Sequence, residues 1–283
     1  MSKSFSISII LLVCIVMSMV AILPIKQTVY AHTFSGDESA AFLALVRQIE
    51  AELGLVDTNL SSNITLAQEH AEHATEHLDA NTTKELAERN ERVSNDLTNG
   101  LSDLQASIMA KPTPAIGVIK EKVGNLNATL QDVIAVRIEK DQLNNSTVNG
   151  LAINDILGEV LEHYGAAYGI AEETGEEEHS NETGAADNTT GTAAGSNTTA
   201  ILDLAEYQSA QAYTNEAWQM LEEVKVLAPS NATSAISNAE NGINEMITAI
   251  NNKAQFTTVD EIVDSKVLPS LRTAFNLTQL SLE

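Results

Sequence analysis

The sequence predicts an all-α protein of two antiparallel bundles, about four helices each, after a cleaved signal peptide. Apolar residues recur at three- and four-residue steps along most of the chain, which is the period of an amphipathic helix. Aromatic residues make up only 4% of the 283 residues, which disfavours a β-sandwich or barrel. Short breaks containing Asn or Pro separate the periodic stretches, as is typical of helices that pack as antiparallel neighbours.

The charge and the cysteine content exclude several classes of function. The chain has 39 Asp+Glu against 15 Lys+Arg, a net charge of -24, which argues against nucleic acid and anionic membrane surfaces as partners. The single cysteine, Cys14, lies in the predicted signal peptide. A mature chain without it would have no thiolate for a zinc site, an iron–sulfur cluster, a nucleophile or a disulfide.

Residues 1–31 have the pattern of a signal peptide, with an apolar run from Ile7 to Leu23. Val29 and Ala31 fit the positions that signal peptidase reads, so cleavage is expected before His32. The alternative is an uncleaved N-terminal anchor, because the apolar run nearly reaches spanning length.

Asn-x-Ser/Thr triplets, the acceptor sequence for N-glycans, are frequent, and eleven of the 23 asparagines begin one. This frequency predicts glycosylated surface positions, although an Asn- and Thr-rich chain could contain the triplets without glycans. We therefore expect a secreted, extracytoplasmic or cell-surface protein with no stable membrane insertion after cleavage. The triplets begin at Asn59, Asn63, Asn81, Asn127, Asn144, Asn145, Asn181, Asn188, Asn197, Asn231 and Asn276.

Residues 32–143 are predicted to form the first bundle. Ser35 and Glu38 have the spacing of a capping box, in which each side chain satisfies the other's free backbone N–H, and they begin the first helix. Pro112 and Pro114 separate the third helix from the fourth. Helices are expected over about residues 37–60, 64–78, 81–108 and 116–138, where the apolar positions repeat.

Residues 144–283 are predicted to form the second bundle, with the domain boundary at Asn144. The segment 174–199 contains no aliphatic side chain larger than Ala, so it is expected to be a disordered acidic loop. Pro269 is expected to kink the last helix. Helices are expected over about residues 147–171, 200–228, 230–254 and 259–280.

The most unusual local sequence runs from Glu69 to His77 and interleaves three histidines with three glutamates. On a helix the histidines share one half-exposed flank, and the glutamates share the neighbouring flank. Imidazoles at this spacing can chelate one metal ion, and nitrogen donors with carboxylates suit copper, zinc or iron. The alternative is a structural or pH-responsive polar face. The principal ligands expected are His70, His73 and His77, with Glu69, Glu72 and Glu76 as secondary oxygen donors.

Two further histidines are candidate metal ligands. His163 follows Glu159 by one turn on the flank of an apolar stripe, so it could complete a site between helices or be a hydrogen-bonded surface residue. If cleavage falls after Ala31, the α-amine and imidazole of His32 could chelate copper through two nitrogens. His179, in the predicted loop, is expected to be solvated.

No catalytic motif stands out. The chain has no Gly-rich phosphate loop, nucleotide fingerprint, Ser-His-Asp spacing or paired-carboxylate glycosidase pattern. We therefore expect no enzymatic activity, with a copper redox enzyme as the remaining alternative.

The stretches 156–168 and 205–213 are rich in Ala, Glu and Tyr, and His73-x-x-Glu76 places a histidine one turn before a glutamate. In these features the chain resembles the extracytoplasmic helical modules of iron permeases and imelysin-type uptake proteins. The resemblance implies iron or copper handling outside the membrane, with a separate membrane permease as partner. The export signal and the frequent triplets also resemble lineage-restricted secreted proteins of archaea.

These observations favour an exported acidic helical protein that binds a transition metal (copper, iron or zinc) outside the membrane, for uptake, storage or delivery. Its expected partners are the metal ion and a membrane permease or envelope protein, and not nucleic acid. The alternative is a non-catalytic cell-surface glycoprotein, an envelope interaction module without a specific metal site.

Overall fold

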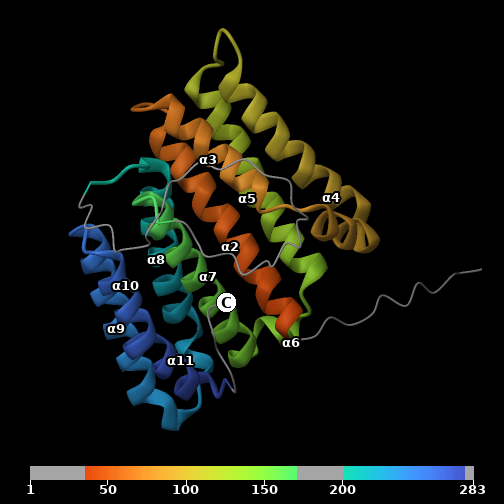
Figure 1. Ribbon diagram of the computed structural model, residues 1–283. Coiled ribbons are helices and arrows are strands. Elements are labelled where there is room, and N and C mark those ends of the chain that lie inside the picture. The colour runs from red at the N-terminus through yellow and green to blue at the C-terminus, as the bar shows by residue number, and fades with distance from the viewer. Residues whose placement is uncertain (1–35, 171–199, 278–283) are drawn as a thin grey trace, which may run out of the picture. The chain divides into compact units, whose positions relative to one another are not determined.

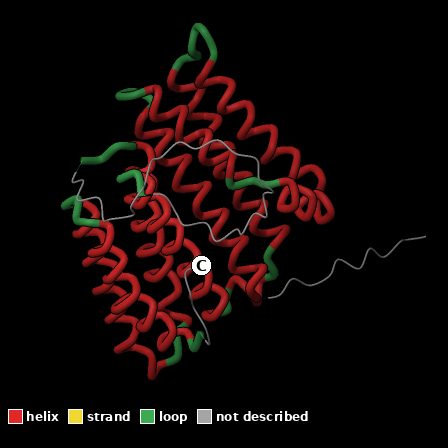
Figure 2. The backbone as a smooth tube through the Cα atoms, viewed as in Figure 1, coloured by secondary structure: helices red, strands yellow, loops and turns green. Residues whose placement is uncertain are grey.

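Figure 1 shows the computed structural model, which describes residues 36–170 and 200–277. Every regular element in these two ranges is a helix and none is a strand (Figure 2), so the predicted all-α fold class is confirmed. None of these helices combines the length and the apolar character needed to cross a membrane. The predicted signal peptide 1–31, His32 and the predicted loop 174–199 lie outside the described residues.

The helices of the first half begin and end close to the predicted positions. They are α2 (Gly36–Asn59), α3 (Ile64–Glu76), α4 (Ala80–Met109), α5 (Ile116–Arg137) and the single-turn α6 (Lys140–Leu143), which the sequence pattern does not predict.

The second half differs from its prediction mainly at its end. Its helices are α7 (Ser146–Ala167), α8 (Leu204–Val224), α9 (Thr233–Asn251), α10 (Phe256–Ile262) and α11 (Leu268–Phe275). A π-helical turn over Val263–Val267 joins α10 to α11, just before Pro269. A proline has no N–H to donate to the preceding turn, which is the physical reason for an irregularity here.

Side-chain caps determine where the helices that carry the candidate site begin. The Asn63 side chain accepts hydrogen bonds from the backbone N–H groups of Thr65 and Leu66 at the start of α3. The Asp203 carboxylate does the same at the start of α8. Each such cap contributes about 1 kcal/mol, since it satisfies backbone donors that a helix leaves free.

Helix α2 lies at the centre of the packing and contacts α3, α5, α7 and α8 (Figure 1). It can contact helices from both halves because its buried residues extend around the helix and do not form one stripe. Leu43, Val46, Ile49 and Leu53 are at most 3% exposed, although Leu43 lies outside the stripe of apolar residues at three- and four-residue steps that contains Ile49 and Leu53. A helix that is apolar around most of its circumference is buried by neighbours on several sides.

The predicted boundary at residues 143 and 144 therefore separates helices that the structure packs together. The described residues, 36–170 and 200–277, belong to one compact unit, and one hydrophobic core continues from α2 through α7 and α8. The physical reason is that α2 supplies apolar side chains to both sets of helices.

Candidate metal centre

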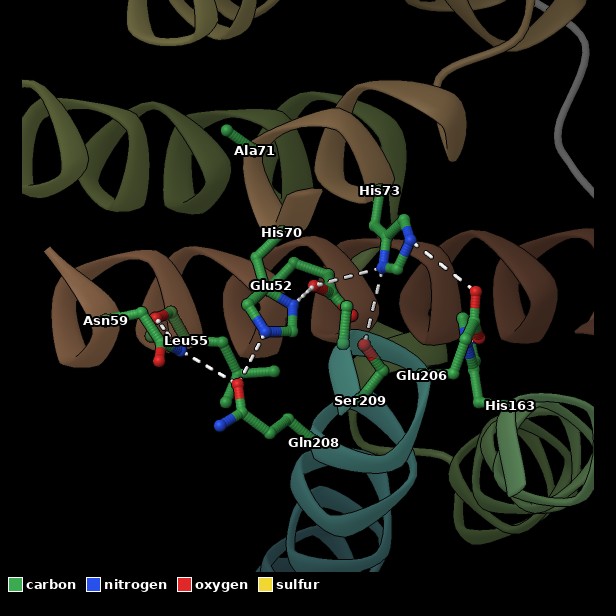
Figure 3. Close-up of polar contacts among 12 residues, drawn as sticks. Glu52, Leu55, Asn59, His70, Ala71, His73, His163, Glu206, Gln208 and Ser209 are labelled. Carbon is green, nitrogen blue, oxygen red and sulfur yellow. Dashed lines mark hydrogen bonds and ion pairs between the residues drawn. The ribbon is translucent and has the colours of Figure 1, made fainter. Parts of the chain in front are cut away.

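His70 and His73 of α3 point inward, toward α2 and α8 (Figure 3). The His70 side chain is fully buried, and its Nδ1 lies 2.8 Å from Oε2 of Glu52, which is also fully buried. The expectation that this flank is half exposed is thus wrong for His70. The reason is that α3 contacts both α2 and α8, and its alanines at positions 67, 71 and 74 allow close approach.

His73 lies between two carboxylates that come from different helices. Its Nδ1 is 3.8 Å from Glu52 Oε2, and its Nε2 is 3.6 Å from Glu206 Oε1. Ser209 Oγ, on α8, is 3.5 Å from the same Nδ1. The ring is 18% exposed, so the two sides of this imidazole face a buried acid and a partly exposed one.

His163 completes the group from α7, as the predicted site between helices requires. Its Nδ1 lies 2.5 Å from Glu206 Oε2, and its Nε2 lies 3.8 Å from Glu159 Oε2. Its ring centroid is 5.8 Å from that of His73. We call Glu52, His70, His73, His163 and Glu206 the His/Glu cluster.

The charges in the His/Glu cluster stabilise one another. Burial raises the pKa of the Glu52 carboxyl, but the hydrogen bond from His70 and the charge of His70 hold this pKa below its ordinary value. The hydrogen bond from His163 lowers the pKa of Glu206. Burial lowers the pKa of His163, yet the hydrogen bond and the charge of Glu206 outweigh burial and raise it. Both carboxyl groups are therefore ionised at neutral pH.

His77, the third predicted ligand, lies beside the His/Glu cluster and outside its two groups of donors. Its Nε2 and the hydroxyl of Tyr213 share a hydrogen bond of 2.7 Å, and the Tyr213 ring lies 5.0 Å from that of His163. Burial lowers the pKa of His77 to about 4, so its imidazole is neutral at pH 7. Burial, together with the negative charge of Glu52, raises the pKa of Tyr213.

The three glutamates predicted as secondary ligands are not brought to the histidines. Glu72 and Glu76 are exposed, and Glu69 lines a surface pocket of about 290 Å³ with Asn63 and Asp203. Their flank of α3 faces solvent, because only the neighbouring flank is covered by α2 and α8. The carboxylates beside the histidines come from other helices, and the sequence interpretation missed both Glu52 and Glu206.

A chain of hydrogen bonds holds His70 through Nε2, the ring nitrogen that does not face Glu52 (Figure 3). Asn59 Nδ2 donates to the Leu55 carbonyl at 3.0 Å and to Gln208 Oε1 at 2.9 Å. Because Oε1 can only accept, His70 Nε2, at 2.9 Å, must donate its proton to it. The Nδ1 atom, which faces Glu52, is therefore free to hold either a second proton or a metal ion.

The same hydrogen bonds correct one predicted glycosylation position. Asn59 is 4% exposed, and its amide nitrogen, the atom that would carry a glycan, makes both of the hydrogen bonds just described. The folded protein cannot present it to a glycan. The remaining triplet asparagines in the described ranges are exposed: Asn63, Asn81, Asn127, Asn144, Asn145, Asn231 and Asn276.

Two sets of donors are close enough to hold a metal ion. Glu52, His70 and His73 form one set, and His73, His163 and Glu206 form the other, with the donor atoms of each set within 4.8 Å of one another. Imidazole nitrogen and carboxylate oxygen are donors that zinc, copper(II) and iron accept. We found no match for this chain among protein-family models, curated proteins or solved structures.

Proposed function

We propose that this protein binds a transition-metal ion, copper, zinc or iron, in the His/Glu cluster. The function is non-enzymatic uptake, storage or delivery of the ion. The proposal keeps three of the ligands expected from the sequence, His70, His73 and His163, and replaces the glutamates of α3 by Glu52 and Glu206.

The spacing of the donor atoms carries this proposal. Two ligands that bind zinc at 2.0–2.1 Å in a tetrahedral site lie about 3.3 Å apart. Glu52 Oε2 is 2.8 Å from His70 Nδ1 and 3.8 Å from His73 Nδ1. The three donor atoms lie within 4.8 Å of one another, so shifts of less than about 1 Å in each side chain would bring all three to one ion.

The burial of Glu52 supports the same conclusion. Its side chain is 0% exposed, and its Oε1 has no hydrogen-bond partner among the described residues. A buried carboxylate oxygen without a partner costs free energy, because it has lost its water and gained nothing in exchange. A cation bound by this carboxylate would offset that cost, which gives the residue a functional reason for its position in the core.

The proposal also includes a location outside the membrane and a partner that receives the ion. The apolar run at the N-terminus and the frequent glycosylation triplets support export, and the net charge of -24 favours cations over anions near the surface. A membrane permease or an envelope protein is the proposed recipient of the ion, on the resemblance to uptake modules.

A second candidate function is a surface glycoprotein without a specific metal site. The exposed triplet asparagines favour it, as does the fact that His70 and His163 already have carboxylate partners. In this case the His/Glu cluster would only hold α2, α3, α7 and α8 together.

Titration of the purified protein with Zn(II) and Cu(II) in a calorimeter separates the two candidates. We expect saturable binding, and a rise in Kd of more than about 100-fold for Glu52→Gln and for His73→Gln, since loss of an outer partner alone costs 10–100-fold. Glu72→Gln, on the exposed flank of α3, is the matched control and should bind as the native protein does. Absence of saturable binding, or equal binding by all variants, would contradict the proposal.

A separate variant distinguishes the His/Glu cluster from the site predicted on the histidine flank of α3, which we call the stripe. His77 belongs to the stripe but not to the cluster, so His77→Gln should keep the native stoichiometry. Circular dichroism of each variant controls for loss of fold. Loss of metal binding in a folded His77→Gln variant would return the site to the stripe.

A further inference from the structure

His73 is the one residue that belongs to both sets of donor atoms. Its Nδ1 faces Glu52, and its Nε2 faces Glu206 (Figure 3). The Glu52 side also contains Nδ1 of His70, and the Glu206 side contains Nδ1 of His163. Each side of the ring therefore has one carboxylate and one further imidazole nitrogen.

A single ion cannot use all five residues. The two nitrogen lone pairs of an imidazole lie in the ring plane and point away from each other. Ions bound to the two nitrogens at 2.0–2.1 Å would lie about 6 Å apart. The His/Glu cluster is thus two adjacent three-donor sites with a common ligand, and not one site with five ligands.

The surroundings of the two sites are alike. In both, a histidine offers Nδ1 to the site while its Nε2 faces an oxygen, Gln208 Oε1 for His70 and Glu159 Oε2 for His163. Such outer partners orient metal-binding histidines and raise their basicity. The arrangement favours occupancy of both sites.

The charges also fit two divalent ions. Glu52 and Glu206 supply two negative charges, which neutralise one ion. Each ion displaces into solvent the Nδ1 proton that His70 or His163 shares with its carboxylate. The second ion also displaces the remaining ring proton of His73, and the imidazolate formed supplies a third negative charge. Glu159, 31% exposed and 3.8 Å from His163, supplies the fourth. Two divalent ions thus leave the pocket with no net charge, which limits the cost of holding charge in a largely buried place.

We propose that the His/Glu cluster holds two transition-metal ions about 6 Å apart, bridged by the His73 ring. This inference rests on the proposed metal-binding function and goes further by assigning two ions and a bridging ligand. Each ion has three protein donors, so one or more coordination positions stay open for water or for transfer to a partner.

The test combines stoichiometry with electron paramagnetic resonance of the Cu(II)-loaded protein. We expect two equivalents to bind, with a full signal from the first ion that falls when the second is added, because two Cu(II) ions on one imidazolate couple antiferromagnetically. The variant with both His163→Gln and Glu206→Gln should bind one equivalent and keep its full signal. His73→Gln should show no coupling at any loading. Glu76→Gln, on the exposed flank, should behave as the native protein.

The outcomes separate the bridge from the simpler proposal. One equivalent in the native protein, with loss of binding in Glu52→Gln, would overturn the bridge and leave the single-ion function intact. Two equivalents with undiminished signals would overturn the bridge as well. Absence of saturable binding would overturn both proposals. If His73→Gln fails to fold, the double variant at His163 and Glu206 still decides between one and two ions.

Discussion

Asn59 and Gln208 are 149 residues apart in the sequence, and the hydrogen bond between them requires a proton on Nε2 of His70. The Leu55 carbonyl fixes the donor end of the Asn59 amide, and Asn59 in turn fixes the acceptor end of Gln208. His70 must then donate from Nε2. A side-chain pair that touches no metal donor atom directly thus prepares Nδ1 of His70 for an ion.

Replacement of Gln208 by Met should weaken metal binding without removing it. Met has a similar length but offers no strong acceptor to His70, so the histidine loses the partner that fixes its tautomer. We expect the Kd for Zn(II) to rise about 10–100-fold. Calorimetric titration measures it, with Gln219→Met at an exposed position of the same helix as the matched control. Equal affinities in the two variants would show that the hydrogen-bond chain plays no part in binding.

Replacement of Glu52 by Ala should destabilise the metal-free protein strongly. The change removes the partner of a fully buried histidine and leaves that polar group without compensation. We expect a loss of about 3–5 kcal/mol in the free energy of unfolding. Urea denaturation in the presence of a chelator measures it. Glu72→Ala, at an exposed position of α3, should change this free energy by less than about 0.5 kcal/mol, and similar losses in both variants would contradict a stabilising contact between Glu52 and His70.

His77 and His163 should change the free energy of unfolding in opposite directions as the pH changes. The pKa of His77 is lowered to about 4 in the folded protein, so between pH 4 and 6.5 the unfolded chain binds more protons there. His77 therefore makes its full contribution to the free energy of unfolding above pH 6.5. This contribution is lost as the pH falls, by about 3 kcal/mol in total. We expect the difference in free energy of unfolding between the native protein and His77→Gln, measured in the presence of a chelator, to change in the same way with pH.

His163 should show the opposite pH dependence of stability and therefore serves as the control. Its pKa is raised by Glu206, so the folded protein binds the extra proton, and the stability that His163 contributes is lost as pH rises through the raised pKa. The difference between the native protein and His163→Gln should therefore shrink toward alkaline pH. Parallel pH profiles for the two variants would contradict the environments assigned to these histidines.

The helices could be predicted from the sequence because their signals are local. Apolar spacing, caps such as Asn63 and proline breaks all act within a few residues, and the structure begins α3 directly after Asn63. The histidine-rich flank of α3 was also found, since His70 and His73 are three residues apart on one helix. These local signals carry no information about which other helix covers that flank.

The carboxylates of the site could not be predicted, because they depend on the packing of α2 and α8 against α3. Glu206 has no local feature that sets it apart from other helical glutamates. Glu52 does carry a signal: it is three residues after Ile49 and four before Val56, so a charge stands within the apolar stripe of α2. A charge in a core-facing position needs a partner, and that requirement could have led to the site.

The packing of α2 against both halves predicts a single unfolding transition. Ile49 is fully buried in α2, and Trp218, the only tryptophan, packs against the same core from α8. Ile49→Ala should lower the free energy of unfolding by about 2–5 kcal/mol, through lost apolar contacts and a cavity. In one cooperative unit, tryptophan fluorescence and far-UV circular dichroism must report the same lowered urea midpoint. Glu121→Ala, at an exposed position of α5, should leave that midpoint nearly unchanged. If α2 belonged to an independent bundle, the fluorescence midpoint would stay at its native value while the dichroism curve split into two steps, and the continuous core would be contradicted.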